Sequence, residues 1–462
     1  MIPMTVKELL EATGGRLMGG SQDVNKEFTG VKTDNRECTE GDLFIAIVGE
    51  KNDAHRFIPG ALEKGAAGCL ISRELESYEA DRFYVLVKDT TLALGDLARC
   101  YRGKFHIPVI GVTGSVGKTT TKDMIAAVLS ARFNVLKTAG NLNNNFGVPR
   151  MLLQLEKEHE IAVIEMGMNH LGEIDYLTKI ARPDAAVITN VGDAHIGNLG
   201  SRENILKAKS EIFAGLSEKG IAVLNGDDGL LRTLEGKIPF PIRWAGQGED
   251  CDYRAVDIDD SFPDKLVFTA KTPHGSFPLE VPQPGRHMLY SVMTAAALGQ
   301  YFGMTNEEIA QGVSSYVPTA MRLDIRELEG NTVLYNGAYN ANSDSMISAL
   351  RTMCAARTAR KAAVLGDMLE QGDFEEELHR KVGRAAAECR LDTLVTVGRA
   401  AGAYLADEAK KAGLKDVRVC RDLEEAKEVL KDLVMEDTAI LFKASHSMHL
   451  EKLFDFCLSL KK

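Results

Sequence analysis

The sequence lacks paired cysteines, a surplus of basic residues and any long apolar run. Its eight cysteines are scattered without a CxxC pair, which argues against a zinc site or structural disulfides and fits a reducing compartment. The net charge is −11, so no basic surplus exists for coating nucleic acid. The N-terminus has no signal-peptide pattern, and no stretch approaches the length of a membrane span. We therefore expect a cytoplasmic protein without nucleic-acid partners or membrane insertion.

The chain is too long for one hydrophobic core, because 462 residues usually divide into two or three domains. Residues 1–87 alternate short strands and helices and predict a small α/β domain. Residues 88–318 alternate helices with strands that are apolar on both faces, which predicts a parallel sheet covered on both sides. An antiparallel addition is expected at 251–281. Residues 319–462 alternate in the same way and predict a second doubly wound, Rossmann-like unit.

The expected elements follow from these apolar runs. Strands are predicted at 42–48, 69–71, 84–87, 107–112, 161–164, 185–189, 221–224, 362–365, 394–397, 417–419 and 439–442. Helices are predicted at 57–64, 375–388, 400–412 and 423–433.

The most specific motif is GVTGSVGKTTTK, residues 111–122. A glycine-rich turn between a strand and a helix points backbone N–H groups at one spot, and the positive end of the helix dipole favours phosphate there. Lys118 can reach the β- and γ-phosphates of a nucleotide, and the Thr119 hydroxyl can bind Mg²⁺. The strict P-loop spacing requires glycine where Val112 stands, and Gly111 is one residue off; the alternative is a glycine-rich turn beside a chance Gly-Lys-Thr. The predicted ATP-binding residues here are Thr113, Gly114, Ser115, Val116, Gly117, Lys118, Thr119 and Thr120.

Two polar segments follow the next predicted strands. Glu165 ends the run AVIEMG, and His195 lies in TNVGDAH after the following run. Ligands of α/β sheets collect at the carboxyl ends of strands, so both residues are candidate Mg²⁺ ligands beside a P-loop. Lys209, on a predicted helix, cannot bind Mg²⁺ as an amine; it could pair with phosphate or be carboxylated by CO₂ to a metal-binding carbamate. The pattern alone favours a solvated helix lysine.

Other candidates are weaker on their own. Asn141, Asn143 and Asn144 crowd one loop after the P-loop helix, where either ligand contacts or a surface turn is expected. Arg322 lies at the predicted hinge and could reach a transferring phosphate. The loops TDNR and DAH of the first segment, around Asp34 and His55, read as solvated loops.

Taken in order, these motifs resemble the Mur ligase family. The resemblance rests on GVTGSVGKTTTK, GNLNNNFGVP, AVIEMG, TNVGDAHIGNLGSRENILKAKSEIF, AVLGDMLEQGDFEEELHRKVG and KASHSMHLE, with TDNR, GEKNDAH and GALEKGAAGCLI in the first segment. It covers essentially the whole chain, and the family pattern also lacks the first P-loop glycine. The activity that it implies is ATP-dependent addition of D-alanyl-D-alanine, or a related dipeptide or depsipeptide, to UDP-N-acetylmuramoyl-tripeptide in peptidoglycan precursor synthesis.

The resemblance also implies an architecture and residue roles. It implies a UDP-sugar domain, a central ATPase domain and a mobile C-terminal domain in a protein expected to be a monomer. It implies ATP and two Mg²⁺ ions as cofactors, with Lys118, Glu165, His195, Lys209 and Arg322 as catalytic residues. The implied metal ligands are Thr119, Glu165, His195 and Lys209, the last as a carbamate. The other implied contacts are Asn141, Asn144 and Asn340 to ATP, and Asp34, Asn35, Arg36, Asp53, His55, Asn143, Tyr339, Asn342 and Ser445 to the substrates.

The chain departs from the family mainly in its third segment. The family's D-x-Y-N-A-N-P reads GAYNANS from Gly337, its G-x-H-N-x-x-N reads GRHMLYS from Gly285, and its K-G-S-R reads KASH from Lys443. In the first segment D-G-H reads Asp53-Ala-His55. These changes leave open an altered nucleotide or amine preference. The alternatives are another amide ligase of the superfamily, such as a folylpolyglutamate synthase-like enzyme, and a non-catalytic nucleotide-binding paralogue.

Overall fold

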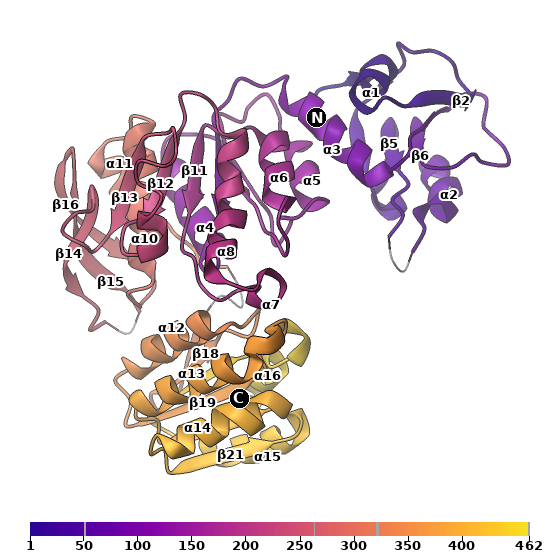
Figure 1. Ribbon diagram of the computed structural model, residues 1–462. Coiled ribbons are helices and arrows are strands. Elements are labelled where there is room, and N and C mark those ends of the chain that lie inside the picture. Colours follow the sequence, from indigo (N-terminus) through magenta and orange to yellow (C-terminus); the bar gives the residue numbers. More distant parts are fainter. Residues whose placement is uncertain (50–51, 263, 320–322, 461–462) are drawn as a thin grey trace.

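The computed structural model describes residues 1–49, 52–262, 264–319 and 323–460. Within these residues the chain forms three main sheets, each with its own helices, in three domains that follow one another along the sequence (Figure 1). The expected fold class is therefore confirmed. Arg322 lies outside the described residues. No helix in the described part of the chain is long and apolar enough to cross a membrane.

The N-terminal domain is a small sheet with the strand order β2-β7-β6-β5-β4. The strands β4 to β7 run parallel, and β2 pairs antiparallel with β7. The expected strands at 42–48, 69–71 and 84–87 are confirmed, whereas β2 was not predicted because its sequence, RLMGG, carries no apolar alternation. The elements are β1 (Met4–Thr5), α1 (Val6–Thr13), β2 (Arg16–Gly20), β3 (Glu27–Phe28), β4 (Gly30–Lys32), β5 (Asp42–Ile45), α2 (Ile58–Glu63), β6 (Gly68–Ile71) and β7 (Phe83–Leu86).

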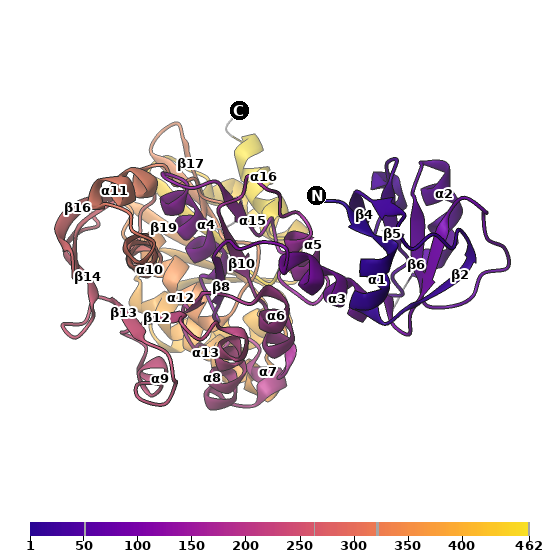
Figure 2. The same ribbon diagram turned by 90° about the horizontal axis from the view of Figure 1, so that it is seen from above.

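Helix α3 (Thr90–Arg102) joins this domain to the central one, as the view from above shows (Figure 2). The buried Tyr101 hydroxyl donates to the carbonyl of Leu155 at 2.7 Å and accepts from the backbone N–H of Ile2 at 2.8 Å. Arg102, also buried, donates to the carbonyl of Ala181 at 3.1 Å. The two domains thus share a packed junction along α3.

The central domain contains a long sheet with the order β16-β15-β14-β13-β12-β11-β8-β10-β9. All neighbours from β9 to β14 pair parallel, and β15 and β16 extend the sheet antiparallel, as predicted for 251–281. The strands β9 and β13 were missed, since β9 is very short and β13 has a charged residue, Arg243, at its second position. The strands are β8 (Val109–Thr113), β9 (Val135–Lys137), β10 (Ile161–Glu165), β11 (Ala185–Ile188), β12 (Ile221–Asn225), β13 (Ile242–Gly246), β14 (Tyr253–Asp259), β15 (Leu266–Thr272) and β16 (Gly275–Val281).

Helices cover both faces of this sheet (Figure 1). Helix α10 is buried over most of its length and packs on α4, which explains why its sequence is apolar nearly all round. The packing fixes α4, whose first turn belongs to the P-loop. The helices are α4 (Lys118–Leu129), α5 (Gly147–Leu152), α6 (Glu173–Ala181), α7 (Ile196–Leu199), α8 (Arg202–Ser210), α9 (Gly229–Arg232), α10 (Met288–Tyr301) and α11 (Asn306–Ser314).

The C-terminal domain has the strand order β17-β18-β22-β19-β20-β21, parallel except for β17. The hairpin β17–β18 was not predicted, although Gly330 and Asn331, both with positive φ, form the turn that such a pair favours. The strands are β17 (Asp324–Leu328), β18 (Thr332–Asn336), β19 (Arg360–Gly366), β20 (Thr393–Val397), β21 (Asp416–Cys420) and β22 (Thr438–Lys443). The helices are α12 (Ser343–Cys354), α13 (Glu375–Glu388), α14 (Ala406–Lys411), α15 (Leu423–Leu433) and α16 (Glu451–Leu460).

The expected helices of this domain are largely confirmed. Those at 375–388 and 423–433 are found with the predicted bounds. The segment predicted as one helix at 400–412 instead begins with a π-helical turn at Ala401–Leu405 and continues as α14.

Candidate active site

The turn between β8 and α4 has the backbone of a P-loop. Gly114 has φ +151°, and a Cβ there would lie 1.8 Å from the Thr189 hydroxyl, so only glycine fits. Gly117 precedes α4 in the left-handed region with φ +83°. The displaced Gly111 lies inside β8, where a Cβ would approach Ile212 to 3.2 Å. Gly111 therefore contributes to packing against the sheet, and the turn begins at Gly114, after the last residue of β8.

Asn190, which the sequence analysis did not single out, holds this turn in place. Its carbonyl accepts from the N–H of Ser115 at 3.0 Å, and its side-chain oxygen accepts from the N–H of Val116 at 2.9 Å. Its amide nitrogen also donates to the carbonyl of Val116 at 2.9 Å. The sequence feature that could have identified Asn190 is its position directly after a buried strand, β11, which pairs with β8. The P-loop is thus shaped by the loop after β11 before any ligand binds.

The first turn of α4 carries the two residues that the motif predicts to act on phosphate. The N–H groups of Thr119 and Thr120 have no helical carbonyl four residues earlier, and they lie at the positive end of the helix dipole. Lys118 Nζ donates to the carbonyl of Gly114 at 2.8 Å, which folds the side chain back over the turn. The ammonium group therefore lies beside the P-loop backbone.

Glu165 ends β10 and is 1% exposed. Its Oε1 accepts from the Asn143 side-chain amide at 2.8 Å, whereas its Oε2 is buried without a hydrogen-bond partner. Its backbone N–H donates to the Thr138 hydroxyl at 2.9 Å. A buried carboxylate oxygen without a partner is unfavourable unless a ligand satisfies it. Asn143, which is expected to bind substrate, also orients this carboxylate.

His195 lies in the left-handed region with φ 63°, just before α7. Burial and the nearby charges of Lys118 and Lys209 lower the pKa of His195 to about 4. The ring is therefore neutral at pH 7, and its contact with Glu370 at 3.6 Å is no ion pair. Its buried Nδ1 has no hydrogen-bond partner. A neutral imidazole with an unsatisfied nitrogen is the form that binds metal ions.

Lys209 on α8 is 1% exposed, so the interpretation as a solvated helix lysine was wrong. None of the carboxylates that the structure describes lies within 4.0 Å of its Nζ. Burial, and then the charge of Lys118, hold the pKa of Lys209 well below its usual value. The sequence pattern missed this because α8 packs against α6 and α7, and its last turn, with Ala208 and Lys209, is buried. Such a lysine holds its proton less tightly than an exposed lysine does.

The donors around the P-loop fit a cation that also binds phosphate. Across the described parts of the chain, no three His, Cys, Asp or Glu side chains form a ready metal cluster. Mg²⁺ typically takes one or two protein oxygens and completes its shell with substrate phosphates and water. Glu165 and Thr119 supply such oxygens, and the partnerless Oε2 of Glu165 supports this assignment. His195 is a less usual donor for Mg²⁺ than for softer metals.

The remaining loop residues are held by local hydrogen bonds. Asn144 accepts from the N–H of Gly147 at 2.8 Å and so caps the start of α5. Asn141 is exposed on the same loop. In the C-terminal domain, Asn342 caps α12 by accepting from the N–H of Ser345 at 2.9 Å. Ser445 accepts from the N–H of Leu369 at 2.9 Å.

Tyr339 and Asn340 lie on the loop between β18 and α12. The Tyr339 ring contacts the His446 ring at a centroid distance of 5.7 Å. Asn340 is exposed, and its carbonyl accepts from Lys443 Nζ at 2.9 Å. Both residues therefore lie at the carboxyl ends of the neighbouring strands β18 and β22, which is where ligands bind in α/β sheets.

The predicted UDP-sugar residues lie together in the N-terminal domain. Asp34 accepts from the backbone and side chain of Arg36, and this hydrogen bonding lowers the pKa of Asp34 to about 2. Asn35 packs against Gly60, where a Cβ would lie 2.9 Å from its amide nitrogen. All three residues occupy the short helical turn after β4.

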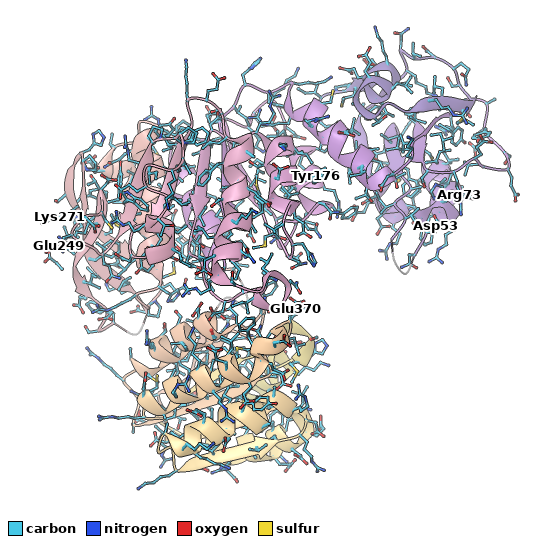
Figure 3. All side chains as sticks on the ribbon, viewed as in Figure 1. Asp53, Arg73, Tyr176, Glu249, Lys271 and Glu370 are labelled. Atoms are coloured by element: carbon cyan, nitrogen blue, oxygen red, sulfur yellow. The ribbon has the colours of Figure 1, made fainter. Side chains whose placement is uncertain are left out.

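Asp53 and His55 form a second fixed pair in this domain. The two side chains are 2.6 Å apart, and the Nε2 of His55 accepts from the N–H of Ser72 at 3.0 Å. The His55 Nδ1 must therefore carry the proton that it donates to Asp53. Arg73 contacts the same carboxylate at 2.9 Å. Figure 3 places Asp53 and Arg73 well away from Glu370, so this arrangement does not bring the N-terminal residues to the P-loop.

A polar contact joins the central and C-terminal domains beside the P-loop. Asp193, between Asn190 and α7, accepts from Lys381 Nζ at 2.8 Å and from the Ser343 hydroxyl at 2.8 Å. Lys381 also donates to Asp344 at 2.9 Å. Burial would raise the pKa of Asp193, but the hydrogen bonds from Lys381 and Ser343 hold it below its usual value. The N-terminus of α12 is thereby fixed next to the loop that shapes the P-loop.

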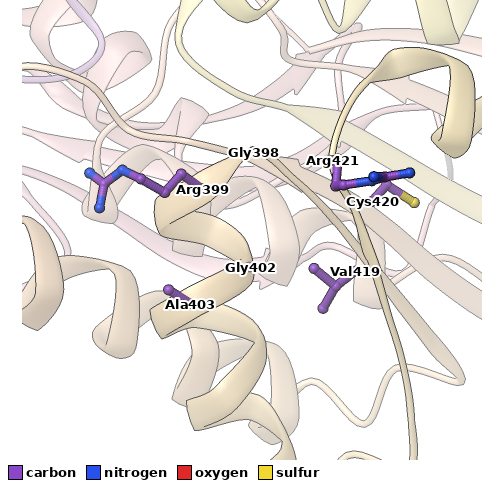
Figure 4. A pocket seen from close by; sticks show the side chains of 7 residues that line it. All are labelled: Gly398, Arg399, Gly402, Ala403, Val419, Cys420 and Arg421. Carbon is purple, nitrogen blue, oxygen red and sulfur yellow. The ribbon is translucent and has the colours of Figure 1, made fainter.

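A surface cavity of about 380 Å³ lies elsewhere, at the carboxyl ends of β20 and β21 (Figure 4). Its wall includes Gly398, Val419 and two arginines, Arg399 and Arg421, that pair with Glu375 and Glu425. None of the predicted site residues lines it. The candidate active site is therefore the P-loop region and not this cavity.

Comparison with known proteins decides the family. Three family descriptions match successive parts of the chain: "Mur ligase family, catalytic domain" at residues 27–102, "Mur ligase middle domain" at 112–299 and "Mur ligase, glutamate ligase domain" at 321–446. The UDP-N-acetylmuramoyl-tripeptide--D-alanyl-D-alanine ligase of Bacillus subtilis is 40% identical, and the alignment covers 98% of both chains. This chain belongs to the Mur ligase family.

Other Mur ligases match over nearly the same length. The Escherichia coli enzyme named as the same ligase is 39% identical over 86% of this chain and 87% of its own. The crystal structure of MurF from Acinetobacter baumannii superposes with a TM-score of 0.90 at 34% identity, covering 99% of both chains. MurF from Thermotoga maritima, solved in complex with ADP, has a TM-score of 0.83 at 28% identity and covers 93% of this chain and 97% of its own. The expected three-domain Mur ligase architecture is thus confirmed.

The folylpolyglutamate synthase alternative has less support. The Mycobacterium tuberculosis enzyme shares the fold with a TM-score of 0.63, but only 16% identity, and it covers 79% of this chain. At this identity the likeness concerns the fold alone.

Proposed function

We propose that this chain is an ATP-dependent peptide ligase that adds D-alanyl-D-alanine to UDP-N-acetylmuramoyl-tripeptide in the cytoplasm, during peptidoglycan precursor synthesis. The observation that carries the proposal is a P-loop with a buried lysine and two side chains that each keep a buried atom without a hydrogen bond, in a chain 40% identical over 98% of its length to a ligase of that name. The groups are the Glu165 carboxylate, the His195 ring and the Lys209 amine. We infer domain bounds of 1–87, 88–318 and 319–462, and a monomer.

The first step transfers the γ-phosphate of ATP to the carboxylate of the tripeptide. A carboxylate oxygen forms the new bond to phosphorus while the bond to the ADP oxygen breaks, which gives an acyl phosphate. Negative charge gathers on the transferring phosphate, and the first-turn amides of α4 and the Lys118 ammonium stabilise it. Lys118 exchanges its hydrogen bond to Gly114 for the phosphate. We assign Arg322 to the same phosphate.

In the second step, the amine of the dipeptide attacks the acyl carbonyl, loses a proton, and expels phosphate from a tetrahedral intermediate. Tyr339, Asn340, Asn342 and Ser445 lie on the face of the C-terminal domain that would present the amine and the nucleoside. The acyl phosphate is protected from water when the domains close over it. Asp34, Asn35, Arg36, Asp53 and His55 hold the UDP-sugar end at the far side of the protein.

Thr119, Glu165, His195 and a carboxylated Lys209 would hold Mg²⁺, which supplies charge neutralisation at the phosphates when bound. Lys209 is suited to carboxylation because its lowered pKa favours the unprotonated amine, which can add to CO₂ with formation of an N–C bond and loss of a proton. The carbamate gives α8 a second anionic oxygen donor near Glu165. Its negative charge would also offset the positive charge of Lys118, which lies near Lys209.

The test is an ADP-release assay with ATP, UDP-N-acetylmuramoyl-tripeptide and a panel of D-,D-dipeptides and D-alanyl-D-lactate. We expect ADP and phosphate only when the acyl and amine substrates are both present. Lys118→Met should lower kcat about 10²- to 10³-fold, the usual effect of losing one charge-stabilising donor. Lys179→Met is the matched control, since Lys179 is an exposed lysine paired with Asp175 on α6.

Two outcomes would contradict the proposal. ADP release that needs no amine would indicate a plain ATPase. Binding of ATP without turnover for any combination of substrates would indicate the non-catalytic paralogue.

A further inference from the structure

A connected series of buried hydrogen bonds includes Asp123, on the P-loop helix α4. Asp123 is 3% exposed. Its Oδ2 accepts from the Thr319 hydroxyl at 2.5 Å. Its Oδ1 lies 3.1 Å from Lys122 Nζ and 2.8 Å from Lys137 Nζ, which reaches it from β9. One carboxylate thus joins α4, β9 and the segment that follows α11.

The series continues from Lys122 to the candidate metal site. Lys122 is 2% exposed, and its Nζ donates to the carbonyl of Thr138 at 2.8 Å. The Thr138 hydroxyl, fully buried, accepts from the backbone N–H of Glu165 at 2.9 Å. Hydrogen bonds and the Lys122–Asp123 ion pair therefore lead without interruption from Thr319 to Glu165. We call these residues, Thr319, Asp123, Lys122, Thr138 and Glu165, the α4 network.

Stability alone gives little reason for such a network. Replacing a buried ion pair by well-packed apolar side chains is often neutral or stabilising, because two charges must be removed from water. What a buried, fully bonded network does provide is a defined position for each partner. Thr319 precedes the connection to the C-terminal sheet, whose first strand, β17, begins at Asp324. The position that Asp123 defines is therefore the start of the interdomain linker.

We propose that Asp123 is a positioning residue that fixes the central end of this linker to the P-loop helix through Thr319. The start of the linker to the C-terminal domain is then positioned by α4, which also holds the phosphates, and by β10, which ends at Glu165. The inference rests on the proposed function, since it assigns the network a role in bringing Tyr339, Asn340 and Ser445 to the nucleotide. Productive geometry must hold to about 0.5 Å, and a linker with a loose origin cannot maintain it.

The experiment compares Thr319→Val with Lys137→Met in the full-length enzyme. Each variant removes one hydrogen bond from the same carboxylate, but only the first releases the linker. We expect Thr319→Val to lower kcat about 10- to 100-fold, the range for a small misplacement far from the chemistry. KM for ATP should change less than about twofold, because a placement defect acts on the reacting geometry rather than on ground-state binding. Lys137→Met should retain kcat.

Small-angle scattering adds a readout that a purely structural role would not change. With a non-hydrolysable ATP analogue and the acyl substrate, the wild-type radius of gyration should fall, and that of Thr319→Val should fall less. Thr319→Ser, which keeps the hydroxyl, should restore both kcat and compaction. This variant also keeps the test decisive if Thr319→Val does not fold.

Equal kcat in wild type and Thr319→Val would overturn the inference, as would equal losses in Thr319→Val and Lys137→Met or a Thr319→Ser variant as slow as Thr319→Val. Failure of the proposed function is distinguishable, because the wild-type enzyme itself would then release no ADP with both substrates present.

Discussion

At the scale of single residues, the site is defined by polar groups that folding leaves unsatisfied. Glu165 and His195 each keep a buried atom without a hydrogen bond, and Lys209 is buried without a described carboxylate within ion-pair distance. Burying each of these groups without a partner costs free energy in the unliganded protein. We propose one explanation for all three, which is a bound ligand with phosphates and a cation at the P-loop.

Lys209→Met should abolish most of the ligase activity if the lysine carries a carbamate. In the wild-type protein, ¹³C-bicarbonate should produce a carbamate signal by NMR, because the lowered pKa of Lys209 favours the unprotonated amine that adds to CO₂. Lys207→Met is the control, since Lys207 is exposed on the same helix. A carbamate signal that persists in Lys209→Met would contradict the assignment.

At the scale of the elements, the P-loop turn depends on a backbone that only glycine adopts. Gly114→Ala would place a Cβ 1.8 Å from the Thr189 hydroxyl at φ +151°. We expect this variant to lose measurable ATP binding by calorimetry, because the turn must open and its N–H groups then no longer converge. Gly229→Ala should bind ATP normally, since its Cβ would meet no atom within 4 Å. Normal affinity in Gly114→Ala would show that the turn tolerates rearrangement.

The attachment of α4 to β9 should depend on pH through Asp123. Burial would raise the pKa of Asp123, but the charge of Lys122 and the hydrogen bonds from Lys137 and Thr319 hold it below its usual value. Its ionised form therefore stabilises the fold above the unfolded pKa, near 4, and this contribution is lost as the pH falls through the lower folded value. Urea unfolding should show Asp123→Asn less stable than wild type at pH 7, with the difference shrinking below about pH 4. A difference that does not change with pH would exclude this charge effect.

At the scale of the whole molecule, the central and C-terminal domains meet through few polar contacts. Asp193 is buried between Lys381 and Ser343, and Gly192 lies so close to Asp344 that a Cβ would approach its carboxylate to 2.2 Å. The α7 segment approaches the C-terminal domain in the same way, around Glu370 (Figure 3). Such polar contacts can stabilise one arrangement of the two domains and still break when the domains adopt a different arrangement.

Lys381→Met should weaken this contact, because it leaves the Asp193 carboxylate with one donor fewer. We expect the contact between the domains to lose about 1 kcal/mol of stabilising free energy. This is small for a hydrogen bond from a charged group, because Lys381 is partly exposed. The ligand-free protein should then show a larger radius of gyration in solution. Lys411→Met, which removes an ion pair within α14, should leave the radius unchanged. Equal radii in all three proteins would mean that the contact does not hold the domains.

The sequence by itself determined the α/β class, the parallel core strands and the P-loop, because these depend on local patterns. Apolar runs identify buried strands, and glycines beside a Gly-Lys-Thr identify the turn. Only the tertiary structure decided which polar residues lose water and which partners they find. The sequence pattern predicted a solvated Lys209, but the packing of α8 against neighbouring helices buries it. Asn190, Asp123 and Lys381 gain their roles from neighbours far away in the chain. Burial and long-range pairing are properties of the packed molecule, so a short stretch of sequence does not determine them.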